Sequence, residues 1–137
     1  IDFDHPAGNG WVMQSEDATS NRNYYFAWFD GSTFQPVGNF GAGKGIQITT
    51  ALWQNITYSK NGTTILGYKN GTQTYTATAG SGNVNYTIGR NIQIGGCISI
   101  AGRNFKGNIP NTLIYNRALS AAEILQNYNA QKSRFGL

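Results

Sequence analysis

Acid–base chemistry in this chain of 137 residues depends on six acidic side chains: Asp2, Asp4, Glu16, Asp17, Asp30 and Glu123. Hydrolysis of a glycosidic bond requires two carboxyl groups that flank the bond, and one strand can supply both if they stand at alternate positions. Asp2 and Asp4 have that spacing, but they lie in a terminal segment of the kind that frays. A turn position explains Asp30, and a helix cap explains Glu123. We therefore expect no catalytic residues and no enzymatic activity.

Metal and nucleophile chemistry are limited by a single histidine and a single cysteine. His5 completes an Asp-x-Asp-His pattern that could hold a divalent ion or could be a polar N-terminal segment. Cys97 stands between a glycine and an isoleucine in a strand-like run, which is typical of a small buried thiol. Asp17 and Asp30 are weak candidates for calcium, which needs six to eight oxygen ligands, and no acidic cluster accompanies them. The sequence predicts no metal site and no cofactor, with calcium as the open alternative.

The most distinctive binding feature is the aromatic run Tyr24-Tyr25-Phe26-Ala27-Trp28-Phe29. In a strand, successive side chains point to opposite faces, so both faces of this run are apolar. One face belongs in a core. The other must be covered by the chain itself, by another subunit, or by a sugar ring stacked on the aromatic side chains. For a glycan ligand we predict a site built from Asn23, Tyr25, Phe29 and Asp30, whose polar members flank the strand and can hydrogen-bond hydroxyl groups.

The composition favours strands joined by tight turns. The chain has 18 glycines and many asparagines and threonines, and three dipeptides are strong hairpin signals: Asp30-Gly31, Asn61-Gly62 and Asn70-Gly71. Apolar residues alternate with polar ones at 46–48, 53–59 and 92–94, and 105–115 ends in an apolar run, so we expect strands at all four places. The Asn-Gly turns are expected to be of type I′.

A helix is predicted only near the end of the chain, at about 120–132. Ser120 and Glu123 form a capping box, and Leu119 and Ile124 form a hydrophobic staple. So short a helix is marginal alone in water and must dock on the sheets. We expect it to do so through Leu119, Ile124, Leu125, Tyr128 and Phe135. The fold class that follows is all-β: a two-sheet antiparallel sandwich, or jelly roll, with one short C-terminal helix.

Charge and length exclude several classes of protein. The net charge is +4 and the isoelectric point is near 9.3, but the ten basic residues are scattered, so we expect no nucleic-acid binding. No apolar run reaches the length of a membrane span, and we expect no membrane insertion. The length suits a single domain, residues 1–137. Because the first residue is Ile1, the chain is expected to be a processed product or part of something longer.

Motifs in the second half resemble those of laminin-G-like domains, which are jelly rolls related to concanavalin A-like lectins and glucanases. They are the paired hairpins from Trp53 to Gly71, the "IG" strand entry at Ile88-Gly89, and a closing strand and capped helix that run from Phe105 through Leu113-Ile114-Tyr115-Asn116-Arg117-Ala118-Leu119-Ser120 to Glu123-Ile124. The match is good over 53–137 and loose over 1–52. The resemblance implies a non-catalytic binding or adhesion module, and the last 24 residues are most similar to phage and environmental-virus structural proteins.

From these observations we predict a non-enzymatic binding module in a virion or an extracellular or secreted assembly. Its expected partners are glycans or a cell-surface polysaccharide, and copies of itself in a homo-oligomer or larger structural assembly. One alternative is a purely structural or decorating subunit that assembles through its apolar sheet face. A second alternative is a relic of a glycoside hydrolase. Four Asn-x-Ser/Thr sequons, at Asn55, Asn61, Asn70 and Asn85, are close to chance frequency and leave glycosylation open.

Overall fold

The computed structural model describes the backbone of residues 2–3, 10–16, 22–29, 33–38, 45–49, 51–78, 91–96 and 104–137. Side chains are described for 45–49, 51–78, 92–96 and 104–137. Within these ranges the chain forms ten strands, one α-helix and one 3₁₀ helix. All the strand pairs are antiparallel, which confirms the prediction of an all-β protein with a short C-terminal helix.

The strands form three sheets. A five-stranded sheet has the order β5-β4-β3-β2-β9, and its strands are β5 (Ile46–Gln47), β4 (Thr33–Gly38), β3 (Arg22–Phe29), β2 (Gly10–Glu16) and β9 (Asn91–Ile94). A three-stranded meander joins β6 (Ile56–Asn61), β7 (Thr64–Lys69) and β8 (Thr72–Thr78). A small sheet pairs β1 (Asp2–Phe3) with β10 (Gly107–Asn108).

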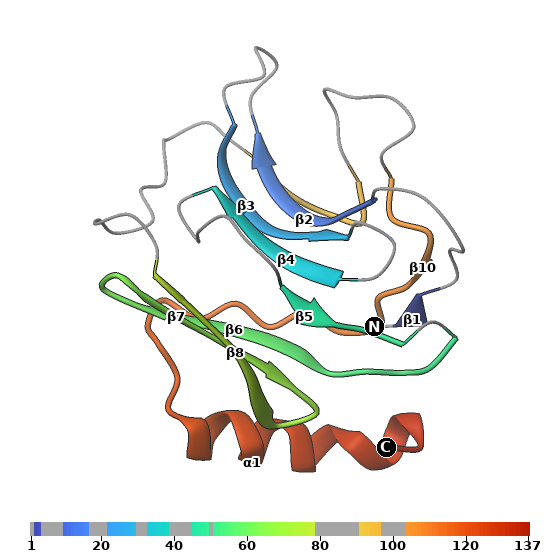
Figure 1. Cartoon of the computed structure of the whole chain (residues 1–137). Coiled ribbons are helices and arrows are strands. Elements are labelled where there is room, and N and C mark those ends of the chain that lie inside the picture. The colour runs from blue at the N-terminus through green and yellow to red at the C-terminus, as the bar shows by residue number, and fades with distance from the viewer. Residues whose placement is uncertain are drawn as a thin grey trace.

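The layers are stacked in the order five-stranded sheet, three-stranded sheet, helix (Figure 1). Helix α1 (Ala121–Gln131) and the 3₁₀ helix η1 (Lys132–Phe135) lie on the side of the meander that faces away from the larger sheet. The meander is therefore covered on both of its faces. This explains why Ile65 and Tyr68, which stand three positions apart on β7 and so belong to opposite faces, are 0% and 2% exposed.

One face of the meander packs toward β5. Ile65 is its buried centre, with Tyr58, Tyr75 and Ala77 packed against it from the two flanking strands. Strand pairing accounts for this cluster. Ile65 and Gly67 are two positions apart on β7 and so share a face, and Tyr58 and Tyr75 both stand opposite Gly67. The Tyr58 and Tyr75 rings meet edge to face with centroids 6.1 Å apart. The other buried hydrophobic side chains among those described are Ile46, Tyr68 and Ile124.

The two Asn-Gly dipeptides form different turns. Asn70 and Gly71 both have positive φ, 51° and 76°, between the paired Lys69 and Thr72, as a type I′ turn requires. The other turn is displaced by one residue from the prediction. Asn61 still belongs to β6 and pairs with Thr64, so the central residues are Gly62 and Thr63, of which only Gly62 has positive φ. A glycine at the first central position is the pattern of type II′ turns.

Helix α1 confirms the predicted capping box. The Ser120 hydroxyl accepts a hydrogen bond from the Glu123 amide, and the Glu123 carboxylate accepts one from the Ser120 amide. Ile124, the predicted staple residue at N4, is 1% exposed. Leu125, which was also predicted to dock, reaches the meander while 45% of it stays exposed. Helical spacing places Leu125 one position round from the buried Ile124, so only part of its side chain reaches the β7–β8 turn at Gly71.

The strand predicted at 105–115 is wrong for most of its length. Gly107–Asn108 pairs with β1, and residues 109–118 are in neither a helix nor a strand. Leu113, Ile114 and Tyr115 are 52%, 48% and 45% exposed. An apolar run forms a strand only where a neighbouring strand is available for its backbone hydrogen bonds, and alternation does not reveal the neighbour. The other three alternating segments include β5, β6 and β9.

The predicted aromatic strand is confirmed at the level of the backbone. It is β3, which lies between β2 and β4 in the larger sheet. Tyr25 stands opposite Gln14 on β2 and Val37 on β4. The side chains of this strand and the dipeptide Asp30-Gly31 lie outside the described residues.

Candidate functional site

A groove opens where the entrance to β6 meets the end of the C-terminal helices. The space between its walls is about 370 Å³, a volume that includes open solvent. Three segments far apart in the sequence line it: the residues before β6, a short stretch after β10, and the last turns of α1 with η1. The lining residues are Trp53, Gln54, Asn55, Pro110, Asn111, Tyr128, Gln131, Lys132, Phe135 and Leu137.

Aromatic rings form much of the groove wall. Trp53 and Phe135 pack with their ring centroids 5.1 Å apart and their planes tilted by 43°. Both side chains are half-buried, so part of each ring remains accessible. Tyr128 adds a third ring, and the Lys132 ammonium group lies 5.6 Å from its centroid. A cation at that distance from an aromatic face is attracted by the ring quadrupole, which holds Lys132 at the groove.

Trp53 is held in place by the buried amide of its neighbour, Gln54, which is 3% exposed. The Gln54 Oε1 atom accepts a hydrogen bond from the Thr49 amide at 3.0 Å. Its Nε2 atom donates to the Thr49 carbonyl at 2.6 Å and to the Leu52 carbonyl at 3.3 Å. These bonds satisfy backbone groups in a connection that has no strand partner, and they fix the direction in which the chain enters β6.

Asn55 is anchored to the turn at the far end of β7. Its amide donates to Asn70 Oδ1 at 2.9 Å, and its carbonyl accepts from the Asn70 amide at 2.8 Å. The Asn55 Oδ1 atom accepts a hydrogen bond from the Thr57 hydroxyl at 3.3 Å. The polar wall next to Trp53 is therefore held on two sides, because Gln54 is bonded to the preceding connection and the Asn55 backbone to the β7–β8 turn.

The groove lining also includes a linked pair of amide side chains. Asn111 Nδ2 donates to Gln131 Oε1 at 2.7 Å, which links the stretch after β10 to the last turn of α1. This bond uses one atom from each amide and leaves Asn111 Oδ1 as an acceptor and Gln131 Nε2 as a donor. Rigid aromatic rings beside paired amide donors and acceptors suit a flat ligand that carries hydroxyl groups.

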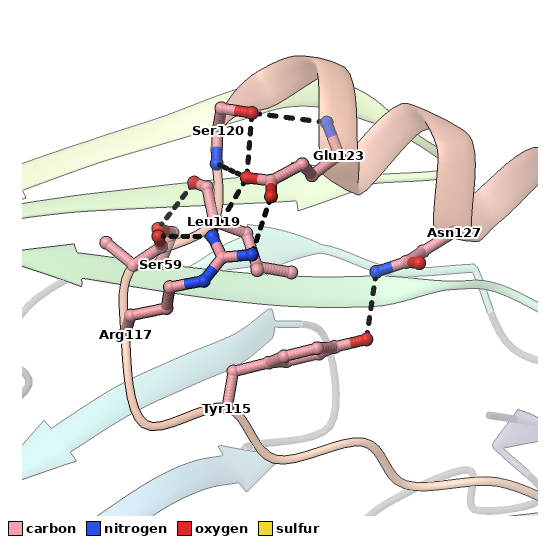
Figure 2. A network of polar contacts seen from close by, with 8 residues as sticks. Ser59, Tyr115, Arg117, Leu119, Ser120, Glu123 and Asn127 are labelled. Atoms are coloured by element: carbon pink, nitrogen blue, oxygen red, sulfur yellow. Dashed lines mark hydrogen bonds and ion pairs between the residues drawn. The ribbon is translucent and has the colours of Figure 1, made fainter.

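A second polar network lies at the start of α1 (Figure 2). Arg117 donates two hydrogen bonds to the Glu123 carboxylate, from Nη2 to Oε1 at 2.6 Å and from Nη1 to Oε2 at 3.1 Å. These bonds, followed by those from the Ser120 amide and hydroxyl, lower the pKa of Glu123 to about 2. The Ser59 hydroxyl donates to the Leu119 carbonyl at 3.0 Å and so ties the beginning of the helix to β6. The role of this network is structural, because both oxygens of the Glu123 carboxylate accept hydrogen bonds from Arg117 or Ser120 at the start of the helix.

The predicted glycan-binding residues are only partly placed. Asn23, Tyr25 and Phe29 belong to β3, but their side chains lie outside the described residues, as does Asp30 entirely. The weak calcium candidates, Asp17 and Asp30, also lie outside them. These assignments stay predictions. The groove was not found from the sequence, because Trp53, Asn111 and Phe135 become neighbours only through the packing of the helices on the meander.

Chemistry of the hydrolytic kind has little support within the described part of the chain. Glu123 is the one carboxylate among the side chains described there, and its oxygens are held by Arg117 and Ser120.

Metal binding and membrane crossing can be examined over the same described residues. They contain no group of three or more histidine, cysteine, aspartate or glutamate side chains placed to hold a metal ion. Neither of the two helices described combines the length and hydropathy that a bilayer crossing demands.

Comparison with known proteins places this architecture. No curated protein matches the chain. A solved structure of an S-layer domain-containing protein from Clostridium thermocellum is similar, with a TM-score of 0.52 and 20% sequence identity. That similarity, which covers 93% of this chain and 66% of the solved one, concerns the fold. The family model of the concanavalin A-like lectin/glucanases superfamily, Laminin_G_3, matches residues 2–125. The strands, the capped helix and this match together show that the chain belongs to the concanavalin A-like lectin/glucanase superfamily.

Proposed function

We propose that this chain is a non-catalytic module that binds glycans in an extracellular or cell-surface assembly, and that the groove at Trp53, Asn111 and Phe135 contributes to the binding. The observation that carries the proposal is the combination of three half-buried aromatic rings with a linked pair of amide side chains in one groove. Family membership supports the same function, since the superfamily includes lectins.

The physical case is the match between groove and ligand. A pyranose ring has apolar C–H faces that stack on aromatic rings, and equatorial hydroxyl groups that require donors and acceptors in fixed positions. Trp53 and Phe135 supply the aromatic rings, while Asn111 Oδ1 supplies an acceptor and Gln131 Nε2 a donor for the hydroxyl groups. The aromatic strand β3, with Asn23, Tyr25, Phe29 and Asp30, is a second glycan site that we propose from the sequence alone.

The proposed setting is a cell surface, a secreted assembly or a virion. The similar fold of an S-layer domain-containing protein supports a surface assembly. The virion setting is proposed from the sequence resemblance of the last 24 residues alone.

A structural subunit is the second candidate function, and a specific observation favours it. Leu113, Ile114 and Tyr115 are consecutive, apolar or aromatic, and about half exposed. Such a run on the surface is a typical contact site for another subunit. Light scattering of the purified protein at increasing concentration decides this candidate, since a subunit of this kind forms defined oligomers and a lectin module that acts alone stays monomeric.

The test of glycan binding is a glycan array followed by titration of the best ligand, read by tryptophan fluorescence. Gln131→Ala removes one polar group from the groove, and Gln126→Ala makes the same change at an exposed position of the same helix outside it. We expect about a tenfold loss of affinity for the first, equivalent to about 1.4 kcal/mol, and none for the second.

Two further variants separate the two proposed sites. Tyr25→Ala tests the strand β3 site, and Trp53→Phe tests the groove while keeping an aromatic ring against Phe135. Weakened binding in Tyr25→Ala with unchanged binding in Gln131→Ala would assign the ligand to β3 instead of the groove. An array with no ligand in the millimolar to micromolar range would contradict the lectin function itself.

A further inference from the structure

The two Asn-Gly dipeptides of the meander have the same chemistry and different surroundings. An asparagine followed by glycine is chemically labile, because the glycine amide nitrogen can attack the carbonyl carbon of the asparagine side chain with little steric hindrance. The reaction requires the local backbone to rearrange, so packing and hydrogen bonds that hold the turn slow it. Asn61-Gly62 and Asn70-Gly71 differ both in packing and in hydrogen bonds.

Asn61-Gly62 stands open at the tip of the β6–β7 hairpin. Both residues are exposed, and a Cβ atom placed on Gly62 would meet nothing within 4 Å. The Asn61 side chain makes no hydrogen bond within the described part of the protein. One polar contact lies at the tip, from Lys60 Nζ to the Gly62 carbonyl at 2.6 Å, and it leaves the Gly62 amide nitrogen untouched.

Asn70-Gly71 is held from two sides, by Asn55 and by helix α1. The Asn70 Oδ1 atom accepts the Asn55 amide at 2.9 Å, and the Asn70 amide donates to the Asn55 carbonyl at 2.8 Å. Helix α1 covers the glycine, since a Cβ atom on Gly71 would lie 3.0 Å from both Leu125 Cδ1 and Tyr128 Cδ1. The side chain that must react is thus locked, and the backbone that must move is packed.

We propose that Asn61 is a site of spontaneous covalent modification in the folded protein, and that Asn70 is protected from the same reaction. The Gly62 nitrogen loses its proton and bonds to Asn61 Cγ, the bond between Asn61 Cγ and Nδ2 breaks, and Nδ2 leaves as ammonia. The product is a five-membered cyclic imide. Water then adds to one of its two carbonyl carbons and opens the ring, which gives aspartate or isoaspartate at position 61.

The modification changes the hairpin in two ways. Each event replaces a neutral amide with a carboxylate, so the formal net charge falls from the present +4 by one unit. The isoaspartate product also inserts an extra methylene group into the backbone at the residue that pairs with Thr64. A two-residue hairpin loop sets the register of its strands, so an added backbone atom there loosens the end of the β6–β7 pair.

The test compares the two dipeptides within one protein, so that each serves as the control for the other. The purified protein is incubated at mildly alkaline pH, which favours the deprotonated amide nitrogen, and is sampled over time. Peptide mapping by mass spectrometry follows conversion of the amide at Asn61 and at Asn70, and methylation by an isoaspartate-specific methyltransferase detects the isomer. A parallel incubation in concentrated urea measures both dipeptides in the unfolded state.

We expect conversion at Asn61 to be at least about tenfold faster than at Asn70 in the folded protein, a ratio equivalent to about 1.4 kcal/mol in activation free energy. In urea the two rates should converge, because the neighbouring residues that cause the difference are gone. Equal rates in the folded protein, or a faster reaction at Asn70, would overturn the proposal. A ratio that persists in urea would also overturn it, since sequence and not structure would then be the cause.

Discussion

The Tyr58 hydroxyl on β6 accepts a hydrogen bond from the Ile46 amide on β5 at 3.3 Å. This bond joins the three-stranded meander to the five-stranded sheet. It also satisfies the backbone amide of Ile46, whose residue is 1% exposed. Burial raises the pKa of Tyr58 above its ordinary value, because the phenolate would lose its hydration. The hydroxyl therefore stays protonated and keeps its place between the sheets.

Removing this hydroxyl should destabilise the protein. In Tyr58→Phe the Ile46 amide loses its acceptor, and an unsatisfied buried donor costs about 1–3 kcal/mol. The measurement is the free energy of unfolding in urea. Tyr115→Phe makes the same chemical change at an exposed residue, whose hydroxyl accepts a hydrogen bond from Asn127 Nδ2 at 3.0 Å. Water can replace this acceptor at the surface, so we expect a loss below about 0.5 kcal/mol. Equal losses in the two variants would refute the role given to Tyr58.

Tyr58 should also make the free energy of unfolding depend on pH in the alkaline range. In the unfolded state a tyrosine has the ordinary pKa of 10.0, whereas in the folded protein the pKa of Tyr58 is higher. Stability from this group is thus fully present below pH 10 and falls as the pH rises above 10, because only the unfolded state releases the proton. Tyr58→Phe should reduce that fall in the urea midpoint. Burial also raises the pKa of Tyr75, so some of the fall should remain in the variant.

A side chain at position 67 has no room. A Cβ atom there would lie 2.9 Å from Tyr58 Cε1 and from Tyr75 Cβ, and 3.0 Å from Ile46 Cδ1. Gly67→Ala should therefore cost about 1–3 kcal/mol by forcing the two tyrosines apart. The control is Gly96→Ala, since the nearest atom to its new Cβ is Asn104 Oδ1 at 3.5 Å. Unchanged stability in Gly67→Ala would contradict the close packing of the two rings.

A single substitution should measure how much the N-cap of α1 contributes to the free energy of unfolding. Ser120→Ala removes the acceptor for the Glu123 amide, which should cost about 1 kcal/mol in the free energy of unfolding. Ser133 is exposed in η1 and makes no hydrogen bond with its side chain among the contacts of the described residues. Ser133→Ala should accordingly leave the urea midpoint within experimental error of the parent protein.

Acid should weaken the start of the helix through Glu123. Its folded pKa is about 2 against an ordinary value of 4.5, chiefly because Arg117 hydrogen-bonds the carboxylate. A lowered pKa contributes stability above pH 4.5 that is lost as the pH falls toward 2. Glu123→Gln should abolish this contribution, so the difference in urea midpoint between parent and variant should shrink between these pH values. A difference that is constant with pH would show that the ion pair does not contribute.

Local signals accounted for much of the fold. Ser120 and Glu123 lie three residues apart, and their capping box depends on no other part of the protein, so the start of α1 was predictable. Asn70 and Gly71 could be assigned a type I′ turn for the same reason. Asn61-Gly62 shows the limit of such signals, because either Asn61-Gly62 or Gly62-Thr63 can form the tip, and the pairing of β6 with β7 selects between them.

What the amino-acid sequence determined by itself is therefore the set of elements that neighbouring residues specify: the capped helix, the hairpins and the antiparallel class of the sheets. The tertiary structure alone decided that Leu113 to Tyr115 forms no strand, that Tyr58 and Tyr75 close over Gly67, and that Trp53 meets Phe135 beside Asn111. The reason is physical. Hydrogen bonds within a turn or cap join residues a few positions apart, whereas strand partners and groove walls come from distant segments whose packing no local pattern encodes.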